Sequence, residues 1–259
     1  MEPATPSNKE SSATGASGAA MPAGPIDKQH VTLSPPLVAT HPKSLVFIFY
    51  CSTMATVAVA WSFYYIVLQH WWMAFLLPLE VLGLAYVFIL SSLFAVKVAV
   101  SIIERRSPVV EGTFEQGGKE MRGYQARLYF KQYAVWLARN STFPWVDKIA
   151  YTMLGVHVGK TVVLHEAWVD TELVEIGDFC MIGMNSAVMS HGLYHDAYIA
   201  RRTVIGNHTV IGAYSVLAPG TRIGDSCVVG ANSGTPLDAT LESNYLYAGN
   251  PARKMKRLE

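Results

Sequence analysis

A repeat of six residues near the end of the chain is the feature that most restricts its fold. From Val204 to Ser233 an aliphatic residue recurs at every sixth position, and a glycine or alanine follows each one. The aliphatic positions are Ile205, Ile211, Leu217, Ile223 and Val229. An amphipathic helix repeats its apolar face every 3.6 residues and a half-buried strand every 2, so neither explains this spacing. A period of six is typical of a parallel β-helix, in which each short strand and corner uses one unit.

The β-helix interpretation assigns a role to each position of the six-residue unit. We expect the aliphatic side chain to point into a narrow core and the glycine to occupy a tight corner, with positive φ where needed. Another small residue stands four positions after each aliphatic residue, where we expect the faces of the three-sided prism formed by the coils to converge. These residues are Thr209, Ser215, Thr221, Cys227 and Ser233.

The same six-residue phase occurs upstream, with one polar exception and one interruption. It runs through Val158, Leu164, Asp170, Ile176, Ile182 and Val188. Asp170 stands where the repeat requires an aliphatic residue, so we expect it to contact substrate or to cap an irregular turn. The phase is lost between about Ser190 and Arg202, which predicts a loop pushed out of the prism. Loops held by a rigid scaffold often carry binding and catalytic groups.

The composition indicates a membrane segment upstream of the repeat. Hydrophobic residues make up 51% of the chain and charged residues only 15%, and no Lys or Arg occurs from Ser44 to Val96. Leu45–Leu68 and Trp72–Val96 are each long enough to cross a bilayer. We therefore predict a two-helix transmembrane hairpin in residues 44–106. The flanking basic residues are Lys28, Lys43, Lys97, Arg105 and Arg106, and their positions predict that both termini and the β-helix are cytoplasmic.

The remaining segments complete a four-part organisation. Residues 1–43 are rich in Ser, Ala, Gly and Pro and predict a disordered tail. Residues 107–154 contain an amphipathic helix at Lys119–Asn140, which either lies in the membrane interface or packs on the open end of the β-helix. A short helix from Pro144 to Leu154 is expected to cover the first coil. Residues 155–259 form the β-helix domain with a C-terminal cap.

Charge and cysteine content exclude several classes of protein. The net charge of +1 argues against a dedicated nucleic-acid-binding protein. The three cysteines are scattered, so they predict neither a disulfide framework nor a paired-cysteine zinc site, and they fit a reducing compartment.

Two segments carry a resemblance to a known family. IGMNSAVMSHGLYHD and NYLYAGNPARKMKR resemble the hexapeptide-repeat acyltransferases, in particular galactoside and maltose acetyltransferases. The resemblance implies a left-handed β-helix, a homotrimer, and acyl transfer from acetyl-CoA or another acyl-CoA to a hydroxyl or amine, with no metal. EGTFEQ and LGVHVGK are similar to the membrane-anchored terminal domain of poly-lysine-synthase-like peptide synthetases, which would allow a carrier-bound thioester as donor.

The resemblance to galactoside-type enzymes also implies roles for individual residues. His191 corresponds to the catalytic histidine, the general base that takes the acceptor's proton, and histidine suits this task because its pKa lies near neutrality. His195 and Asp196 match a pair that orients the base or the acceptor, and Asn185 matches an asparagine that contacts the acceptor. With the membrane segment nearby, we expect the acceptor to be a glycan, a lipid-linked intermediate or a peptide at the cytoplasmic surface.

Coenzyme A is expected in the groove between neighbouring prisms of the trimer. The family resemblance implies that Ala213, Ala231 and Ser233 let its pantetheine arm approach the backbone, and that Arg253 and Lys256 meet its phosphates. The chain departs from the family after the last unit, where it reads SGTPLD in place of a sequence like SVVTKD and lacks the lysine.

Two alternatives remain open at the level of sequence. The γ-type carbonic anhydrases share the fold and bind zinc through three histidines, and His165, His191, His195 and His208 are available here. Their spacing does not match that family, however. The second alternative is a trimeric scaffold without catalytic activity, attached to the membrane by the helices.

Overall fold

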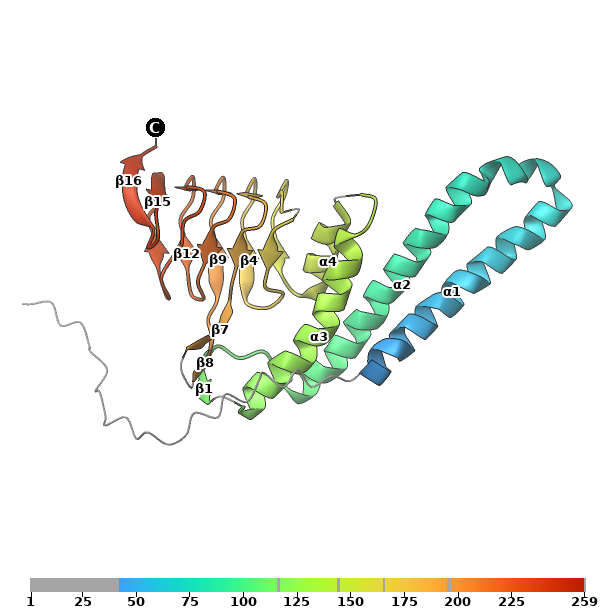
Figure 1. Cartoon of the computed structure of the whole chain (residues 1–259), viewed down its shortest axis with the longest axis horizontal. Helices are drawn as coiled ribbons and strands as arrows, with labels where there is room; N and C mark the ends of the chain where they lie inside the picture. The colour runs from blue at the N-terminus through green and yellow to red at the C-terminus, as the bar shows by residue number, and fades with distance from the viewer. Residues whose placement is uncertain (1–41, 116, 144, 165, 195–196, 259) are drawn as a thin grey trace, which may run out of the picture. The chain divides into compact units, whose positions relative to one another are not determined.

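The computed structural model describes residues 42–258, apart from residues 116, 144, 165 and 195–196. Nearly all of the expected tail, residues 1–43, lies outside the described part. These described residues form five helical segments and sixteen strands, several of which are labelled in Figure 1. The helical segments are α1 (Pro42–Gln69), the 3₁₀ helix η1 (Trp71–Leu76), α2 (Leu77–Arg106), α3 (Lys119–Arg139) and α4 (Trp145–Leu154).

The six-residue units form a parallel β-helix with three sheets, as predicted. Val204 pairs with Arg222 and Val210 with Val228, so each regular coil takes three units. The first sheet contains β2 (His157–Val158), β4 (Val174–Ile176), β9 (Thr203–Ile205), β12 (Arg222–Ile223) and β14 (Thr240–Leu241). The second contains β5 (Met181–Ile182), β10 (Val210–Ile211), β13 (Val228–Val229), β15 (Tyr245–Ala248) and β16 (Arg253–Arg257). The third contains β3 (Trp168–Val169), β6 (Ala187–Val188) and β11 (Val216–Leu217).

The predicted aliphatic positions form the core of the β-helix. Ile205, Ile211, Leu217, Ile223 and Val229 are all buried, and they join one apolar cluster with Ile176, Ile182 and Val188. Burying such side chains is worth about 1.5–3 kcal/mol each before the entropy of ordering the chain is subtracted. The core therefore accounts for the strict period of the sequence.

The expected role of the glycines in the repeat is wrong in one respect. The described glycines that follow the aliphatic residues do not have positive φ; Asn185 (φ 53°) and Tyr214 (φ 59°), three residues after an aliphatic, have it instead. Glycine is required at position 183 for a steric reason: a Cβ there would lie 2.5 Å from the backbone nitrogen of Ala213 in the next coil. The close approach of stacked coils at the corner, not backbone strain, selects glycine.

Asp170 does not occupy a core position, contrary to the sequence phase. Val169 pairs with Val188 and fills the core, so the register is one residue earlier than the strict repeat. Asp170 follows at the corner after β3, where its own N–H donates to the carbonyl of Val188 (3.0 Å). This shift removes the carboxylate from the apolar core and aims it at the next coil.

The segment expected to leave the prism does so as a hairpin. β7 (His191–Tyr194) and β8 (Ala197–Ala200) pair antiparallel, and β1 (Gly112–Glu115) pairs antiparallel with β8. Figure 1 shows this three-stranded sheet beside the stacked coils. The chain before α3 therefore supplies the outer strand, which local sequence patterns did not predict.

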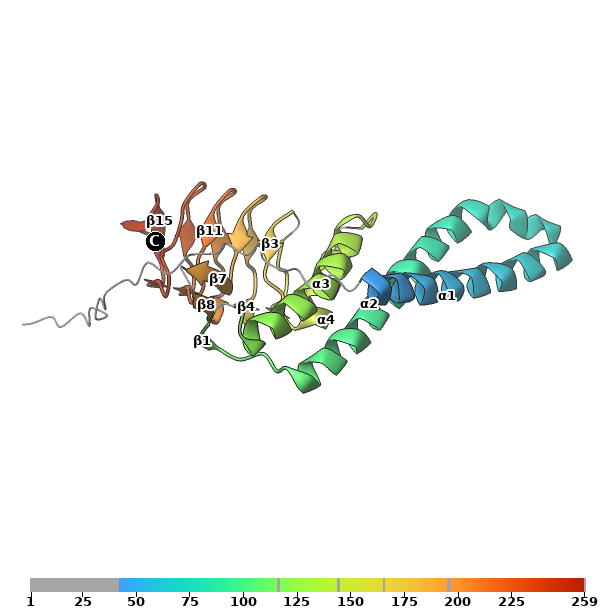
Figure 2. The same ribbon diagram turned by 60° about the horizontal axis from the view of Figure 1, so that its bottom comes forward.

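Helices α3 and α4 pack on the first coil and against α2. Both views place them between the β-helix and the α1–α2 pair (Figures 1 and 2). The face of α3 that packs inward includes two basic residues, Arg127 and Lys131, both at most 2% exposed. Of the two expectations for this helix, the structure supports packing on the open end, because these cations point into the protein.

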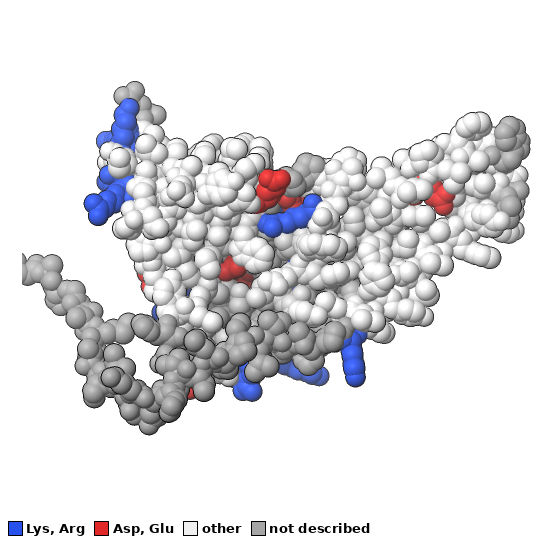
Figure 3. All heavy atoms as spheres, in the orientation of Figure 1, with Lys and Arg blue, Asp and Glu red and all other residues white. Residues whose placement is uncertain are grey.

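Helices α1 and α2 lie side by side and expose apolar residues along their length. By length and composition, Lys43–Val67 and Ala74–Arg106 are each apolar enough to cross a membrane. The second α-helix begins at Leu77 and not at Trp72 as expected, because Trp71–Leu76 forms a 3₁₀ turn. On the face shown in Figure 3 the α1–α2 surface is almost free of charge, and Lys and Arg gather at the C-terminal strand.

Candidate active site

His191 begins the extruded hairpin, at the corner where the chain leaves the prism after β6. It is the first residue of β7 and only 5% exposed. The position follows from the repeat. Val188 in β6 is the last core residue before the chain leaves the prism, and the regular coils begin again at Thr203, the first residue of β9. The imidazole is thus held between the β-helix, the hairpin and helix α3.

Asp170 from the preceding coil faces His191. Its Oδ2 accepts hydrogen bonds from the backbone N–H groups of Ser190 (2.8 Å) and His191 (3.2 Å) and lies 3.4 Å from His191 Nδ1. The other oxygen, Oδ1, accepts from the indole N–H of Trp168 (3.3 Å). The carboxylate therefore holds both the backbone and the ring of the histidine.

Ser190 determines which ring nitrogen carries the proton. Its hydroxyl donates to the backbone carbonyl of Glu172 (2.5 Å), which can only accept. Ser190 Oγ is therefore the acceptor in its 2.7 Å contact with His191 Nδ1. In the neutral ring this places the hydrogen on Nδ1 and leaves the lone pair on Nε2. An imidazole in this tautomer can take a proton at Nε2.

A buried carboxylate lies on the Nε2 side of the ring. Glu172 Oε2 is 3.9 Å from His191 Nε2 and the side chain is 2% exposed. Two cations of α3 hold this carboxylate: Arg127 donates through Nε (2.6 Å) and Nη2 (3.0 Å), and Lys131 through Nζ (3.0 Å). Burial by itself would raise the pKa of Glu172, but the Arg127 hydrogen bonds and the Lys131 charge outweigh it and hold the pKa below its ordinary value.

Two tyrosines cover the face of the imidazole. The rings of Tyr124 on α3 and Tyr198 on β8 stack with His191, with centroids 4.1 Å and 5.9 Å away. Burial, followed by the nearby carboxylates, raises the pKa of both phenols. Both tyrosines therefore stay neutral, and they add aromatic surface to the site without charge.

The other predicted residues lie at a different corner of the prism. Asn185 is exposed and occupies the left-handed corner position of its coil (φ 53°). Ala213 and Ala231 stand at the same corner in the next two coils, because Ala213 stacks on Gly183 and Ala231 on Gly212. The sheet of β3, β6 and β11 separates this corner from the corner that carries His191. Within one chain, the base and these residues are not brought together.

The two remaining groups of coenzyme A candidates differ in exposure. Ser233 is 2% exposed, and its hydroxyl accepts the N–H of Gly249 (3.1 Å), so its side chain holds the corner of the coil. The expected contact of Ser233 with coenzyme A stays a prediction. Arg253 and Lys256 are exposed on β16, where they are free to meet an anionic ligand.

Several predicted residues lie outside the described part of the chain. His195 and Asp196, the expected orienting pair, are not among the described residues. His165, one candidate ligand of the zinc alternative, is also outside. Of the other zinc candidates, His208 stacks on Phe179 (5.0 Å) between β9 and β10, at a corner away from His191. Among the described residues no cluster of three potential metal ligands occurs.

Sequence reasoning missed the residues that surround the base. Ser190, Glu172 and Tyr124 were not predicted, and Asp170 was given another role. The spacing of Arg127 and Lys131 places both cations on one face of α3, which was a usable signal for a buried acidic partner. Nothing local pointed to Glu172 as that partner, because it lies more than forty positions away.

The chain is similar to several known proteins. Residues 202–235 match the family model described as bacterial transferase hexapeptide (six repeats). The acetyltransferase YvoF of Bacillus subtilis is 29% identical over 45% of this chain and 70% of its own length. Galactoside O-acetyltransferase of Escherichia coli is 30% identical over 44% of this chain and 61% of its own length. The crystal structure of a maltose O-acetyltransferase from Clostridium difficile 630 aligns with a TM-score of 0.48 and 18% identity over 58% of this chain and 95% of that one.

The parallel β-helix with its extruded hairpin defines a protein of the hexapeptide-repeat class. Residues 202–235 carry the repeat of the hexapeptide transferases, and nearly half of the chain is similar to proteins named as acetyltransferases, in agreement with the motifs.

Proposed function

We propose that this protein is a membrane-anchored acetyltransferase that moves the acetyl group of acetyl-CoA to a hydroxyl or amine. The observation that supports it best is the environment of His191. Ser190 and Asp170 hold Nδ1, and the lone pair of Nε2 is left for an acceptor. The relatives named as acetyltransferases support the reaction class and the use of coenzyme A as co-substrate.

The residues around His191 support a direct transfer. His191 Nε2 takes the proton of the acceptor as its oxygen or nitrogen forms a bond to the thioester carbonyl carbon. The tetrahedral adduct then expels the thiolate of coenzyme A, which receives the proton from the imidazolium. Asp170 and Glu172 stabilise that imidazolium by their charges. Because His191 is 5% exposed, a neighbouring group must move for the acceptor to reach Nε2.

A homotrimer would complete the site. One chain carries His191 and the small-residue corner of Ala213 and Ala231 on opposite sides of one sheet. A neighbouring prism can bring its own corner to the base, so that coenzyme A lies between two protomers. In this arrangement Asn185 would reach the acceptor from the same corner, and Arg253 and Lys256 would meet the phosphates.

The helices support attachment to a membrane. Two apolar segments of spanning length precede the catalytic part, and basic residues lie at the outer ends of the pair. The positive-inside rule places the β-helix in the cytoplasm. An acceptor close to the bilayer, such as a lipid-linked intermediate, a glycan or a peptide, suits this location.

The experiment that separates an enzyme from a scaffold measures binding and turnover on the full chain in detergent. We expect coenzyme A to bind in calorimetry and candidate acceptors to cause free-thiol release from acetyl-CoA. A scaffold would show neither, and the absence of coenzyme A binding would overturn the proposal. Stoichiometric zinc in the purified protein would instead favour the carbonic-anhydrase-like alternative.

A further inference from the structure

The turn between α3 and α4 packs against the middle of α2. Phe143 in this turn stacks on Tyr86 of α2, with ring centroids 5.5 Å apart, and Trp145, the first residue of α4, stacks on Phe143 at 5.6 Å. Tyr86 lies nine residues after Leu77 and twenty before Arg106, the two ends of α2. The turn therefore meets α2 well inside the segment that we propose crosses the membrane.

The exposed surface of α2 is apolar on both sides of this contact. Leu79 before Tyr86, and Leu90 and Phe94 after it, are each at least 50% exposed. Leu79 and Phe94 are about 22 Å apart along the helix, less than the hydrocarbon thickness of about 30 Å. A bilayer that covers both side chains also includes the level of Tyr86. Phe143, stacked on Tyr86, then has lipid and not water as its neighbour.

The outer side of the turn carries large apolar side chains and no charge. Trp136, Phe143, Trp145 and Ile149 are all exposed, and we call these four residues the apolar edge. No Asp, Glu, Lys or Arg occurs in residues 140–146. Tryptophan and phenylalanine are typical of surfaces that enter the interface between lipid and water. The composition of the apolar edge thus suits a lipid surface as its partner.

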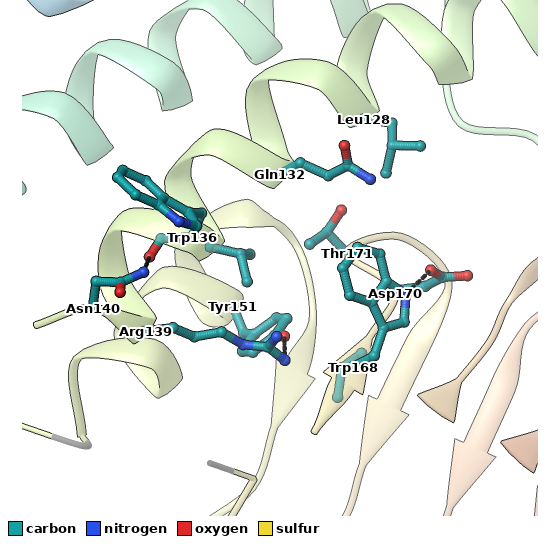
Figure 4. Close-up of a pocket in the computed structure, with 11 residues that line it drawn as sticks. Leu128, Gln132, Trp136, Arg139, Asn140, Tyr151, Trp168, Asp170 and Thr171 are labelled. Atoms are coloured by element: carbon teal, nitrogen blue, oxygen red, sulfur yellow. Dashed lines mark hydrogen bonds between the residues drawn. The ribbon is translucent and has the colours of Figure 1, made fainter. Parts of the chain in front are cut away.

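The charged residues that flank the turn are directed into the protein. Arg139 donates from Nη2 to the hydroxyl of Tyr151 (3.2 Å), and Figure 4 shows its side chain directed toward that residue. Lys148 donates from Nζ to the carbonyl of Gly159 in the first coil (2.7 Å), and Asp147 is buried. Charged side chains at a surface that meets water are mostly exposed. Their inward orientation here keeps charge away from the apolar edge.

Several polar groups of the turn are satisfied within the turn itself. Asn140 donates its backbone N–H (3.2 Å) and its side-chain amide (2.8 Å) to the carbonyl of Trp136, and Figure 4 shows the bond of the amide. The carbonyl of Phe143 accepts the hydroxyl of Ser141 (3.1 Å) and the N–H of Val146 (3.2 Å). Backbone groups that leave water must find such partners in the protein. These bonds lower the cost of moving the turn from water into the interface.

We infer that the apolar edge inserts into the bilayer beside α2, about 5–10 Å into the boundary between headgroups and acyl chains. The inference rests on the proposed attachment of α1 and α2 to a membrane and adds a contact made by the catalytic part itself. Tyr124, which stacks on His191, lies twelve residues before Trp136, about 18 Å along α3. Insertion of the edge therefore keeps the proposed base close to the membrane surface.

The test uses spin labels on single cysteines of the full chain in vesicles of phosphatidylcholine and phosphatidylglycerol. Thr142→Cys in a Cys51→Ser background labels the turn, and Met255→Cys in the same background labels exposed β16. We expect the label at position 142 to lose the relaxation by a water-soluble nickel chelate that the label at 255 shows, and to keep relaxation by oxygen, which concentrates in hydrocarbon. Cys180 and Cys227 are buried and stay unlabelled.

Equal access of the nickel chelate to positions 142 and 255 would overturn the inference. Protection of position 142 from both nickel and oxygen would also overturn it, because a protein surface would then cover the apolar edge. The wild type labelled at Cys51, which is exposed on α1, separates this failure from that of the proposed attachment. If Cys51 is protected from nickel and position 142 is not, the helices are inserted and the edge is not. If all three positions are open to nickel, both proposals fail.

Discussion

At the scale of single residues, Asp170 shows how a small register shift creates chemistry. The strict repeat places Asp170 in the apolar core. In the structure β3 is one residue out of phase with that repeat, so Val169 fills the core position. The displaced carboxylate then reaches the backbone of Ser190 and the ring of His191 in the next coil. The sequence predicted that this acid is unusual, but not its partner, because the register depends on contacts between coils.

The first prediction concerns Asp170→Asn. The amide keeps the shape of the side chain but loses the charge that we propose stabilises the imidazolium, and its NH2 group disturbs the hydrogen bonds to Ser190 and His191. We expect kcat for acetyl transfer to fall by at least about tenfold with little change in the KM for acetyl-CoA. Steady-state kinetics checks this. A normal kcat, or a change in KM alone, would contradict a positioning role.

The second prediction follows from the lowered pKa of Glu172. A carboxylate with a depressed pKa in the folded protein adds stability above its unfolded pKa of about 4.3, and this stability is lost as the pH falls through the folded value. At pH 7, Glu172→Gln should destabilise the protein, because Arg127 and Lys131 are then buried without their counter-ion. The difference from wild type should shrink below about pH 4. Thermal unfolding in detergent across pH tests this, and a difference that does not change with pH would refute it.

At the scale of elements, the repeat predicted the coils well and the surrounding helices poorly. A periodic core depends on neighbours one coil away, so its pattern is visible in the sequence. The pairing of β1 with β8 and the burial of Arg127 against Glu172 join segments far apart in the chain. No local period records such contacts, which is why α3 remained compatible with a membrane-interface role at the level of sequence.

The third prediction tests the core of the coils with two neighbouring residues of β11. Leu217 is fully buried and Val216 is 45% exposed on the same strand. Leu217→Ala should lower the free energy of unfolding by about 2–5 kcal/mol, because it leaves a cavity in a stacked core. Val216→Ala, the matched control, should change it by less than about 0.5 kcal/mol. Chemical denaturation measures both; equal effects would show that the aliphatic column does not carry the fold.

At the scale of the whole molecule, the proposed site depends on two forms of assembly: attachment to a bilayer and association of three prisms. Within the part of the chain that the structure describes, no element covers the apolar surfaces of α1 and α2 along much of their length, and exposed apolar patches of this kind mark interaction surfaces. The 3₁₀ helix η1 connects α1 and α2 and carries exposed Trp72, and aromatic residues at such a position commonly anchor a span.

The fourth prediction concerns topology. An alkaline phosphatase reporter, active only outside the cytoplasm, should be active when fused after His70 and inactive when fused after Glu259. Comparing the two fusions in the same cells controls for expression. The reverse pattern would place the β-helix outside the cytoplasm, away from cellular acetyl-CoA, and two inactive fusions would argue against a spanning pair.

The most direct test of the central claim compares acetyl transfer by wild type and His191→Ala, with coenzyme A binding as the control for folding. The account predicts that His191→Ala binds coenzyme A normally but releases free thiol at least about 10²-fold more slowly in the presence of acceptor, the range expected for loss of a general base. Equal rates for the two proteins would show that His191 is not the base.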